Sequence, residues 1–403
     1  MTSWLEAEAI WKSLDDKFKG WTPGQQEAYD LWEGQQLMNM LLFFPTGKGK
    51  TKTALSLLAD RGEKEVVVIA PPKVQKDWQR DAKALGLSIR TDSHAKFRMQ
   101  ATQYKQGVAI IVDEYHLLGG HSAMGWKKLN RMARRLMAPI LMLSATPNYN
   151  DAERVFCLTA IGDSEPDRNY MDWLWKTCNC KANMFSAYPD VDKDHPFKDF
   201  DGGALEFLIA KNWVAYIPDD AVWEEDTMPM HNFVGSHFED YNYDARNHKI
   251  IASDMEKYHK RIYQQFIDDD GFIRTDIMRE IFVQMGLADR DKWLIFCSHA
   301  PVAKALFNTM IKLTNTVFFI DGDLAESVVE SEKQGFIKTE GKAYLIGTAT
   351  LATGVDGIDK VCQTLLILDD IRGDGSLRRQ LIGRILPRGE DDGISRLVIT
   401  ATF

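Results

Sequence analysis

The apolar positions of this chain gather in runs of strand length that alternate with segments of helical spacing. From residue 37 to residue 146 the apolar runs are LMNMLLFF, EVVVIAPP, VAIIVDE and PILMLSATP. Runs of this length with helices between them are typical of parallel strands buried on both faces of a sheet. The pattern returns near the C-terminus in KWLIFCS, TVFFIDG, KAYLIGTA, QTLLILDD and SRLVITATF. We therefore predict an α/β protein with two parallel-sheet lobes.

The stretch between the two patterned regions has a different composition. Its first half is rich in aromatic residues, Pro and Gly, and its second half contains NHKIIASDMEKYHKRIYQQFI and RTDIMREIFVQMGL, which have helical spacing. We expect a mostly helical insertion here, with its aromatic side chains forming a small core rather than a platform for base stacking. The predicted domains are 1–150, 151–290 and 291–403.

Composition adds few constraints to this picture. The net charge of −9 argues against indiscriminate coating of nucleic acid, although a local basic groove would be sufficient for a motor. No apolar run approaches the roughly 20 residues that span a bilayer, so we expect no membrane association. The five cysteines are an odd, sparse number that suits a reducing, cytoplasmic environment. We also expect a monomer, either targeted by a protein partner or encoded by a compact phage or viral genome.

A glycine-rich segment follows the first predicted strand. Glycines let backbone N–H groups turn towards phosphate oxygens, and the start of a helix adds its positive dipole end. Lys50 can reach the β- and γ-phosphates, and Thr51 can bind Mg²⁺. Position 44 is Phe where the general pattern has Gly, so a glycine turn without a ligand stays an alternative at this point. The candidate nucleotide-binding residues of this phosphate loop are Pro45, Thr46, Gly47, Lys48, Gly49, Lys50 and Thr51.

Two adjacent carboxylates end the run VAIIVDE. Asp113 and Glu114 would lie at the carboxyl end of a buried strand, where open α/β sheets bind ligands. Burying charge is costly, and Mg²⁺ would compensate for it. We expect Asp113 to hold the metal through its water shell and Glu114 to act as the general base on an attacking water. Solvated acids at a strand end are the alternative, which the upstream phosphate loop weakens.

Several segments in order resemble the motifs of the superfamily 2 helicases and translocases. PTGKGKT (45–51), DEYH (113–116) and SAT (144–146) resemble motifs I, II and III. WTPGQ (21–25), APPKVQKDW (70–78), LIFCSH (294–299), GTATLATGVDG (347–357) and QLIGRILPR (380–388) resemble the adenine-recognising segment and motifs Ia, IV, V and VI. The form of motif Ia is most like the Swi/Snf branch, while the D-E-Y-H box also suits phage UvsW-type enzymes.

This resemblance implies two RecA-like lobes with ATP and Mg²⁺ in a cleft between them and nucleic acid across both. It implies that Gln25 reads adenine and that Asp356 faces the cleft. Ser144 and Thr146 would link the ATP site to the nucleic-acid path. His116 would couple motif II to Gln380 or to motif III, and Thr350 would contact the nucleic-acid backbone.

Motif VI departs from the pattern of the family at one position. The family has Q-x-x-G-R-x-x-R, and Gln380, Gly383 and Arg384 match it, but position 387 is Pro and the second arginine is Arg388. The resemblance implies that Arg384 contacts the γ-phosphate. Proline restricts φ to about −65°, so the turn could bring Arg388 into a second catalytic position or leave it paired with nearby acids in solvent. We lean towards the second catalytic position.

Basic residues near motifs Ia and II are candidates for contacts with nucleic-acid phosphates. For Lys127 and Lys128, which follow motif II, a solvated basic surface that balances an acidic protein is an equally good interpretation. The candidates are Lys73, Lys76, Lys127 and Lys128.

The function expected from these features is an ATP-dependent DNA helicase or double-stranded DNA translocase. An RNA helicase is an alternative, which the D-E-Y-H form of motif II makes weaker. A phosphate-loop ATPase that acts on a protein partner without nucleic acid is a third hypothesis. The effect of each polymer on the rate of ATP hydrolysis distinguishes the three.

Overall fold

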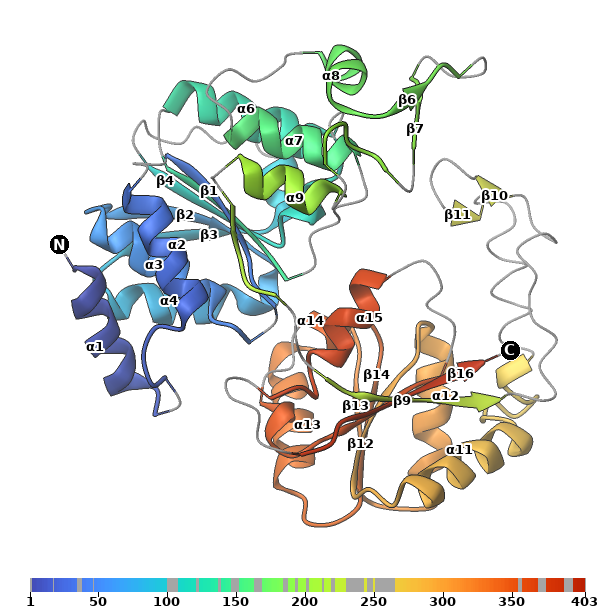
Figure 1. Ribbon diagram of the computed structural model, residues 1–403. Helices are drawn as coiled ribbons and strands as arrows, with labels where there is room; N and C mark the ends of the chain where they lie inside the picture. Colours follow the sequence, from blue (N-terminus) through green and yellow to red (C-terminus); the bar gives the residue numbers. More distant parts are fainter. Residues whose placement is uncertain are drawn as a thin grey trace. The chain divides into compact units, whose positions relative to one another are not determined.

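Parallel strands form two sheets of six strands each in the computed structural model of the chain (Figure 1). The sheets belong to two compact units, Met1–Asp219 and Asp220–Phe403. Each unit is therefore an α/β lobe, as the apolar runs predict. The structure describes residues 2–16, 18–34, 38–45, 47–99, 108–120, 123–136, 139–145, 152–162, 169–183, 188–192, 195–200, 203–211, 214–218, 222–229, 243–244, 249–250, 265–353, 357–368, 375–387 and 394–402.

The sheet of the first unit has the strand order β3-β2-β4-β5-β1-β8. Alternate residues of its strands point to opposite faces, and both faces are buried. Leu41 and Phe43 contribute to one core, whereas Met40 and Leu42 contribute to the other. A strand covered on both faces is apolar at every position, which is why its sequence reads as a continuous run. The strands are β1 (Asn39–Phe43), β2 (Glu65–Ile69), β3 (Ser88–Asp92), β4 (Ala109–Asp113), β5 (Ile140–Ser144) and β8 (Val214–Tyr216).

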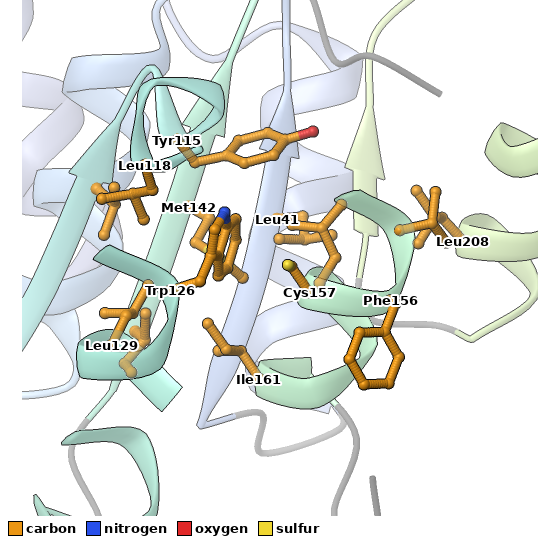
Figure 2. Packing of buried hydrophobic residues seen from close by; sticks show 14 of the residues in the cluster. Leu41, Tyr115, Leu118, Trp126, Leu129, Met142, Phe156, Cys157, Ile161 and Leu208 are labelled. Atoms are coloured by element: carbon orange, nitrogen blue, oxygen red, sulfur yellow. The ribbon is translucent and has the colours of Figure 1, made fainter. Parts of the chain in front are cut away.

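Helices cover both faces of this first sheet. One core includes Ala28, Leu57 and Trp78, from three helices of the N-terminal part. The other face packs against Trp126, Phe156 and further side chains that surround Leu41 and Met142 (Figure 2). The helices are α1 (Trp4–Leu14), α2 (Pro23–Gly34), α3 (Lys50–Asp60), α4 (Gln75–Ala84), α5 (His94–Met99), α6 (Met124–Leu136), α7 (Ala152–Gly162), α8 (Tyr170–Thr177) and α9 (Gly203–Ala210), with short turns η1 (Pro72–Val74) and η2 (Tyr115–Leu118).

The second unit repeats this plan with the strand order β13-β14-β12-β15-β16-β9. Its two cores again take alternate residues of a central strand, with Trp293 and Ile295 on one face and Leu294 and Phe296 on the other. The strands are β9 (Glu224–Pro229), β12 (Lys292–Phe296), β13 (Val317–Ile320), β14 (Ala343–Gly347), β15 (Thr364–Ile367) and β16 (Leu397–Thr402). The helices are α11 (Thr275–Ala288), α12 (Ala300–Met310), α13 (Glu326–Lys338), α14 (Thr350–Thr353) and α15 (Gly375–Ile382), with η4 (Ile358–Lys360).

The stretch predicted as a separate insertion, 151–290, is divided between the two units at residue 219. Its N-terminal part, with α7, α8, α9 and β8, belongs to the first unit, and β8 pairs in parallel with β1. Its C-terminal part belongs to the second unit, where β9 pairs in parallel with β16. The sequence does not reveal this division, because β8 and β9 are edge strands. β8 has only three residues, VAY, and the sequence of β9, EEDTMP, is mostly polar, so neither resembles the longer apolar runs of the central strands. Two hairpins, β6 (Cys180–Lys181) with β7 (Asp190–Val191) and β10 (Tyr243–Asp244) with β11 (Lys249–Ile250), also lie in this stretch.

The aromatic residues of this stretch pack inside the first unit. Phe156, Trp173, Phe197 and Phe207 are buried in the same core as Leu41, and Phe197 stacks on Phe207 with 5.2 Å between ring centroids. These aromatic side chains are therefore buried in the main core of the first unit rather than in a small core of a separate insertion. Within the described ranges no helix is both long and apolar enough to cross a membrane.

Candidate functional site

Three neighbouring strands bring the predicted motif residues to one edge of the first sheet. β5 lies between β1 and β4, and the register pairs Phe43 with Ser144 and Asp113 with Leu143. The phosphate loop, the Asp113–Glu114 pair and Ser144 therefore lie at the carboxyl ends of three adjacent strands. Ligands of open parallel sheets bind at this edge.

The phosphate loop turns through two glycines with left-handed backbone angles. Gly47 has φ 82° and Gly49 has φ 78°, and α3 begins at the next residue, Lys50. The Lys50 ammonium donates hydrogen bonds to the carbonyl oxygens of Phe44 at 2.9 Å and Pro45 at 3.4 Å. The loop is thus curled around the start of a helix, the backbone form that binds phosphate. Thr51 lies half-buried in the first turn of α3, Lys48 is also half-buried, and Thr46 lies outside the described residues.

Gln25, predicted to read adenine, has a buried side chain that is already hydrogen-bonded on both atoms. Its Oε1 accepts from the backbone N–H of Thr22 at 2.9 Å, and its Nε2 donates to Thr53 Oγ1 at 3.1 Å. Thr22 and Gln25 thereby form a capping box at the start of α2. The T-x-x-Q spacing is the signal that sequence reasoning missed. In the structure Gln25 joins α2 to α3, and adenine recognition stays a prediction.

We expect Gly49→Ala to lower the free energy of unfolding of the first unit by about 3 kcal/mol. A Cβ at Gly49 would lie 2.4 Å from Gln25 Nε2, in addition to the strain of φ 78°. Gly86 is a matched control because its φ is 73° and a Cβ there meets nothing within 4 Å. Gly86→Ala should therefore cost only about 1 kcal/mol. Urea denaturation measures both, and equal losses would show that the Gln25 contact does not restrict the loop.

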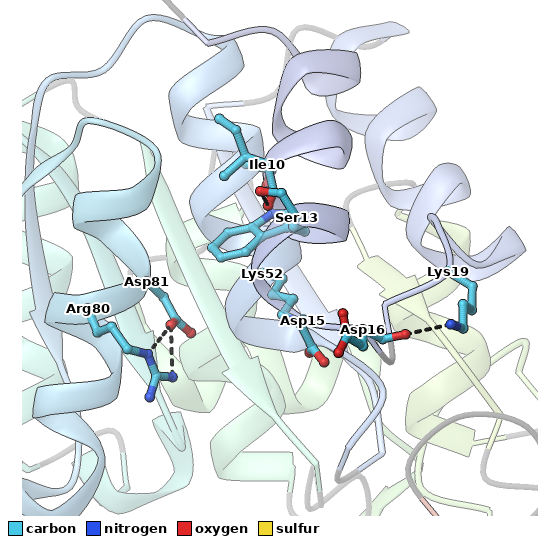
Figure 3. Close-up of polar contacts among 10 residues, drawn as sticks. Ile10, Ser13, Asp15, Asp16, Lys19, Lys52, Arg80 and Asp81 are labelled. Carbon is cyan, nitrogen blue, oxygen red and sulfur yellow. Dashed lines mark hydrogen bonds and ion pairs between the residues drawn. The ribbon is translucent and has the colours of Figure 1, made fainter.

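The N-terminal helix α1 also contacts α3. Trp11 Nε1 donates to Ser56 Oγ at 2.9 Å in the buried interface, and the Lys52 ammonium pairs with Asp15 at 2.5 Å (Figure 3). These contacts fix the helix that continues the phosphate loop. The sequence does not show which face of the sheet this helix covers.

Asp113 lies in an environment of concentrated negative charge. Burial, followed by the neighbouring Glu114 carboxylate, raises the pKa of Asp113 to about 7, against the opposing effects of the Lys50 ammonium and a hydrogen bond from Trp78. That bond runs from Trp78 Nε1 to Asp113 Oδ2 over 3.2 Å. A divalent cation would relieve this charge, and the carboxylate and the Thr51 hydroxyl are the hard oxygen donors that Mg²⁺ prefers. The residues present therefore fit Mg²⁺.

Two residues that the sequence does not assign to the site form hydrogen bonds with Asp113. Trp78 on α4 is buried and orients the carboxylate, while His94 Nε2 lies 2.8 Å from the Asp113 carbonyl oxygen. Burial is the largest effect on His94 and lowers its pKa to about 4, so the imidazole is neutral at pH 7 and donates this bond. Neither residue belongs to a sequence motif for metal binding, because both act on a ligand rather than as one.

Glu114 has a backbone conformation that is unusual for a residue with a side chain. Its φ is 49° and its ψ is 55°, in the left-handed region, at the turn from β4 into η2. This conformation costs on the order of 1 kcal/mol, and such strain is concentrated at functional sites. The turn ends the strand immediately after Asp113, so the two carboxylates are held on successive residues in different backbone conformations.

His116 connects motif II with motif III. Its Nδ1 lies 3.4 Å from Glu114 Oε2 and 3.5 Å from Ser144 Oγ, and Ser144 is completely buried. The structure thus brings together three residues that were predicted to act in catalysis and coupling. Thr146 lies outside the described residues, and the coupling role stays a prediction.

The second unit holds Thr350 of motif V on α14 and Gln380 of motif VI on α15, and Arg384 lies in the turn that follows α15. The Arg384 guanidinium donates to the Ala352 carbonyl oxygen through Nε at 3.0 Å and also through Nη2. Thr350 exposes only 6% of its surface at the start of α14, and Gln380 is half-buried on α15. Motifs V and VI are therefore joined by Arg384. Asp356 and Arg388 lie outside the described residues.

The four candidate nucleic-acid lysines differ in their surroundings. Lys76 on α4 and Lys127 on α6 are exposed, and Lys73 in η1 is half-buried. Lys128, by contrast, donates to the Phe97 carbonyl oxygen at 2.7 Å and lies over the Phe97 ring. Lys128 therefore joins α6 to α5, a structural role that the sequence does not reveal. Nearby Arg80 on α4 forms an ion pair with Asp81 (Figure 3).

Comparison with solved structures finds several that are similar to this chain. Dbp5 of S. cerevisiae, bound to RNA and ADP BeF3, has a TM-score of 0.58 and 14% sequence identity, and the match covers 100% of this chain and 90% of that one. Mss116p, bound to ssRNA and AMP-PNP, has a TM-score of 0.56 and 12% identity, over 100% of this chain and 72% of that one. A SWI2/SNF2 ATPase core of Sulfolobus solfataricus, in complex with dsDNA, has a TM-score of 0.40 and 14% identity, over 95% and 88%. No protein-family model and no curated protein sequence matches the chain.

At these identities the first two matches establish the fold and not the activity. The sheet order, the helices on both faces and the full coverage of the chain agree with the architecture that the motifs predict. The chain has two parallel-sheet α/β lobes, a fold that it shares with Dbp5 and Mss116p.

Proposed function

We propose that the chain is an ATP-dependent nucleic-acid motor that couples ATP hydrolysis to movement along a strand. The observation that carries the proposal is the arrangement at the carboxyl edge of the first sheet, where the phosphate loop, the Asp113–Glu114 pair and Ser144 end three adjacent strands. The fold supports the nucleic-acid part of the proposal, since Dbp5 and Mss116p are each bound to RNA together with a nucleotide analogue.

The residues of the first unit divide the chemistry of hydrolysis among them. The phosphate loop binds the phosphates through its N–H groups, with Lys50 against the β- and γ-oxygens. Thr51 and Asp113 would hold Mg²⁺, which would supply positive charge against the phosphate oxygens. Glu114 accepts a proton from the water whose oxygen attacks the γ-phosphorus, while the bond from that phosphorus to the leaving ADP oxygen breaks. The products are ADP and inorganic phosphate.

Residues of the second unit complete this proposal. Arg384 stabilises negative charge on the γ-phosphate during transfer, and Gln380, Asp356 and Arg388 act beside it, as the motif resemblance implies. The bond from Arg384 to the Ala352 carbonyl offers a route by which motif V responds to the state of the nucleotide.

DNA is the polymer that we propose, with RNA as the alternative. The Swi/Snf form of motif Ia and the D-E-Y-H form of motif II favour DNA, whereas Dbp5 and Mss116p are bound to RNA. Lys73, Lys76, Lys127 and Thr350 are the proposed contacts to the phosphate backbone. Such contacts follow the strand without reading its sequence.

We expect Lys127→Glu to weaken nucleic-acid binding and to lower the slope of log affinity against log salt by about 1. Lys127 is exposed on α6, so the change should leave folding intact. Lys64→Glu is the matched control, because Lys64 is exposed at the amino end of β2, the edge opposite the motif residues. Fluorescence anisotropy at several salt concentrations measures both variants. An equal effect of the two would show a general charge effect rather than a contact at α6.

The experiment that tests the proposed function is the rate of ATP hydrolysis with no polymer, single-stranded DNA, duplex DNA or RNA. Stimulation by any polymer supports the motor, and stimulation by duplex but not by single strands selects a translocase on double-stranded DNA. Stimulation by RNA alone would replace DNA with RNA as the substrate. The same rate under all four conditions would contradict the proposal and favour an ATPase that acts on a protein partner.

A further inference from the structure

Arg396 is a buried cation that the proposed chemistry does not use. It lies directly before β16 and exposes only 2% of its surface. Arginine is seldom buried to this degree, because removing a guanidinium from water is costly unless its N–H groups find acceptors. The identity of those acceptors therefore indicates what the residue does.

The guanidinium binds the carbonyl oxygens at both ends of one segment. Its Nε donates to the Ile385 carbonyl at 2.7 Å, and its Nη1 donates to the Ile394 carbonyl. Ile385 directly follows Arg384, and the residues between the two carbonyls, 386–393, include Arg388 in the sequence. A single side chain thus joins the two ends of the segment that leaves motif VI.

The geometry of the guanidinium makes this contact restrictive. Its donors form a rigid planar fork, so two carbonyls bound to different nitrogens are held in a fixed relation to each other. Ile385 is itself completely buried, and the adjoining Arg384 donates to the Ala352 carbonyl. The backbone of motif VI is therefore fixed from β16 on one side and from α14 on the other.

We propose that Arg396 is a positioning residue that holds the backbone of motif VI so that the Arg384 side chain reaches the γ-phosphate. This inference rests on the proposed ATPase function. Arg396 acts through Arg384 and does not touch the nucleotide itself. A lysine cannot replace it, because an ammonium is a point charge and cannot reproduce the fork.

The test compares Arg396→Lys and Arg396→Gln with wild type in polymer-stimulated ATP hydrolysis. We expect kcat to fall by about 10²-fold in each, the effect of displacing a catalytic group by about 1 Å. The KM for ATP should change by less than about twofold, because the phosphate loop belongs to the other unit and is untouched. A rise in the KM for ATP without a fall in kcat would overturn the proposal.

A double-mutant cycle separates positioning from a general loss of stability. In an Arg384→Ala background, Arg396→Lys should lower kcat by less than about twofold, because the group that it positions has gone. Multiplicative effects of the two changes would contradict the proposal. A wild type that does not hydrolyse ATP would instead refute the proposed function, so the two failures are distinguishable.

Lys292→Met is the control for structural damage in the same unit. The Lys292 ammonium also binds two carbonyl oxygens, those of Phe336 at 2.8 Å and Ile337 at 2.9 Å, at the start of β12. Lys292→Met should lower the thermal midpoint without lowering kcat. An equal loss of kcat in Lys292→Met and Arg396→Lys, or failure of both Arg396 variants to fold, would assign Arg396 a purely structural role and overturn the proposal.

Discussion

Glu114→Gln is expected to reduce ATP hydrolysis by about 10²- to 10⁴-fold while ATP binding is retained. Glutamine has the same shape and can keep the left-handed backbone at φ 49°, but its amide cannot accept the proton of the attacking water. The phosphate loop and Lys50 are unchanged, so the nucleotide should still bind. Phosphate release at saturating polymer measures hydrolysis, and a fluorescent nucleotide analogue measures binding.

Asp289→Asn provides the control for this substitution. Asp289 also has an acidic side chain and a left-handed backbone, with φ 43°, but it caps α11 in the second unit. The same change from acid to amide there should leave hydrolysis within about twofold of wild type. Normal turnover by Glu114→Gln would show that another group is the general base.

Arg384→Ala is expected to reduce hydrolysis by about 10³- to 10⁵-fold, the effect of losing an arginine that stabilises the transferring phosphoryl group. Of the motif VI residues proposed to act on the nucleotide, Gln380 is neutral and cannot replace the positive charge of Arg384. Its loss also removes the hydrogen bonds to the Ala352 carbonyl oxygen. Arg384→Lys should restore part of the rate, because it keeps the charge but not the fork.

Arg378→Ala tests whether any arginine of α15 would show this loss. Arg378 forms an ion pair with Glu225 at 3.1 Å at the surface, and pairs of this kind contribute little to stability. Its replacement should leave the rate within about twofold of wild type. The same kinetic assay measures both variants, and comparable losses at Arg378 and Arg384 would remove the special role of Arg384.

The parts of the fold that could be predicted are those in which burial determines the sequence. Strands such as β1 and β4 are covered on both faces, so residues 40–43 and 109–112 are all apolar and the run is visible in the sequence. The edge strands carry a weaker signal, because β8 has only three residues and β9 is mostly polar, and a sequence interpretation treats them as parts of an insertion. The boundary at residue 219 follows from their pairing with β1 and β16, which only the structure reveals.

The candidate site also has residues that the sequence reveals and residues that it does not. Residues that would contact the ligand, such as Lys50 and Asp113, are recognisable because the chemistry requires those residue types at fixed places after a strand. Residues that support them, such as Trp78 and Arg396, are not recognisable, because many different side chains could hold a carboxylate or a carbonyl. Gln25 shows an ambiguity of another kind, because one motif is compatible with a capping box and with a nucleotide contact.

The most direct test of the central claim is whether ATP hydrolysis moves the protein along nucleic acid. The measurement is displacement of an annealed strand, or of a third strand on duplex, from the polymer that stimulates hydrolysis. The account predicts displacement with ATP and none with a non-hydrolysable analogue or with Glu114→Gln. Polymer-stimulated hydrolysis by wild type without displacement on either substrate would contradict it.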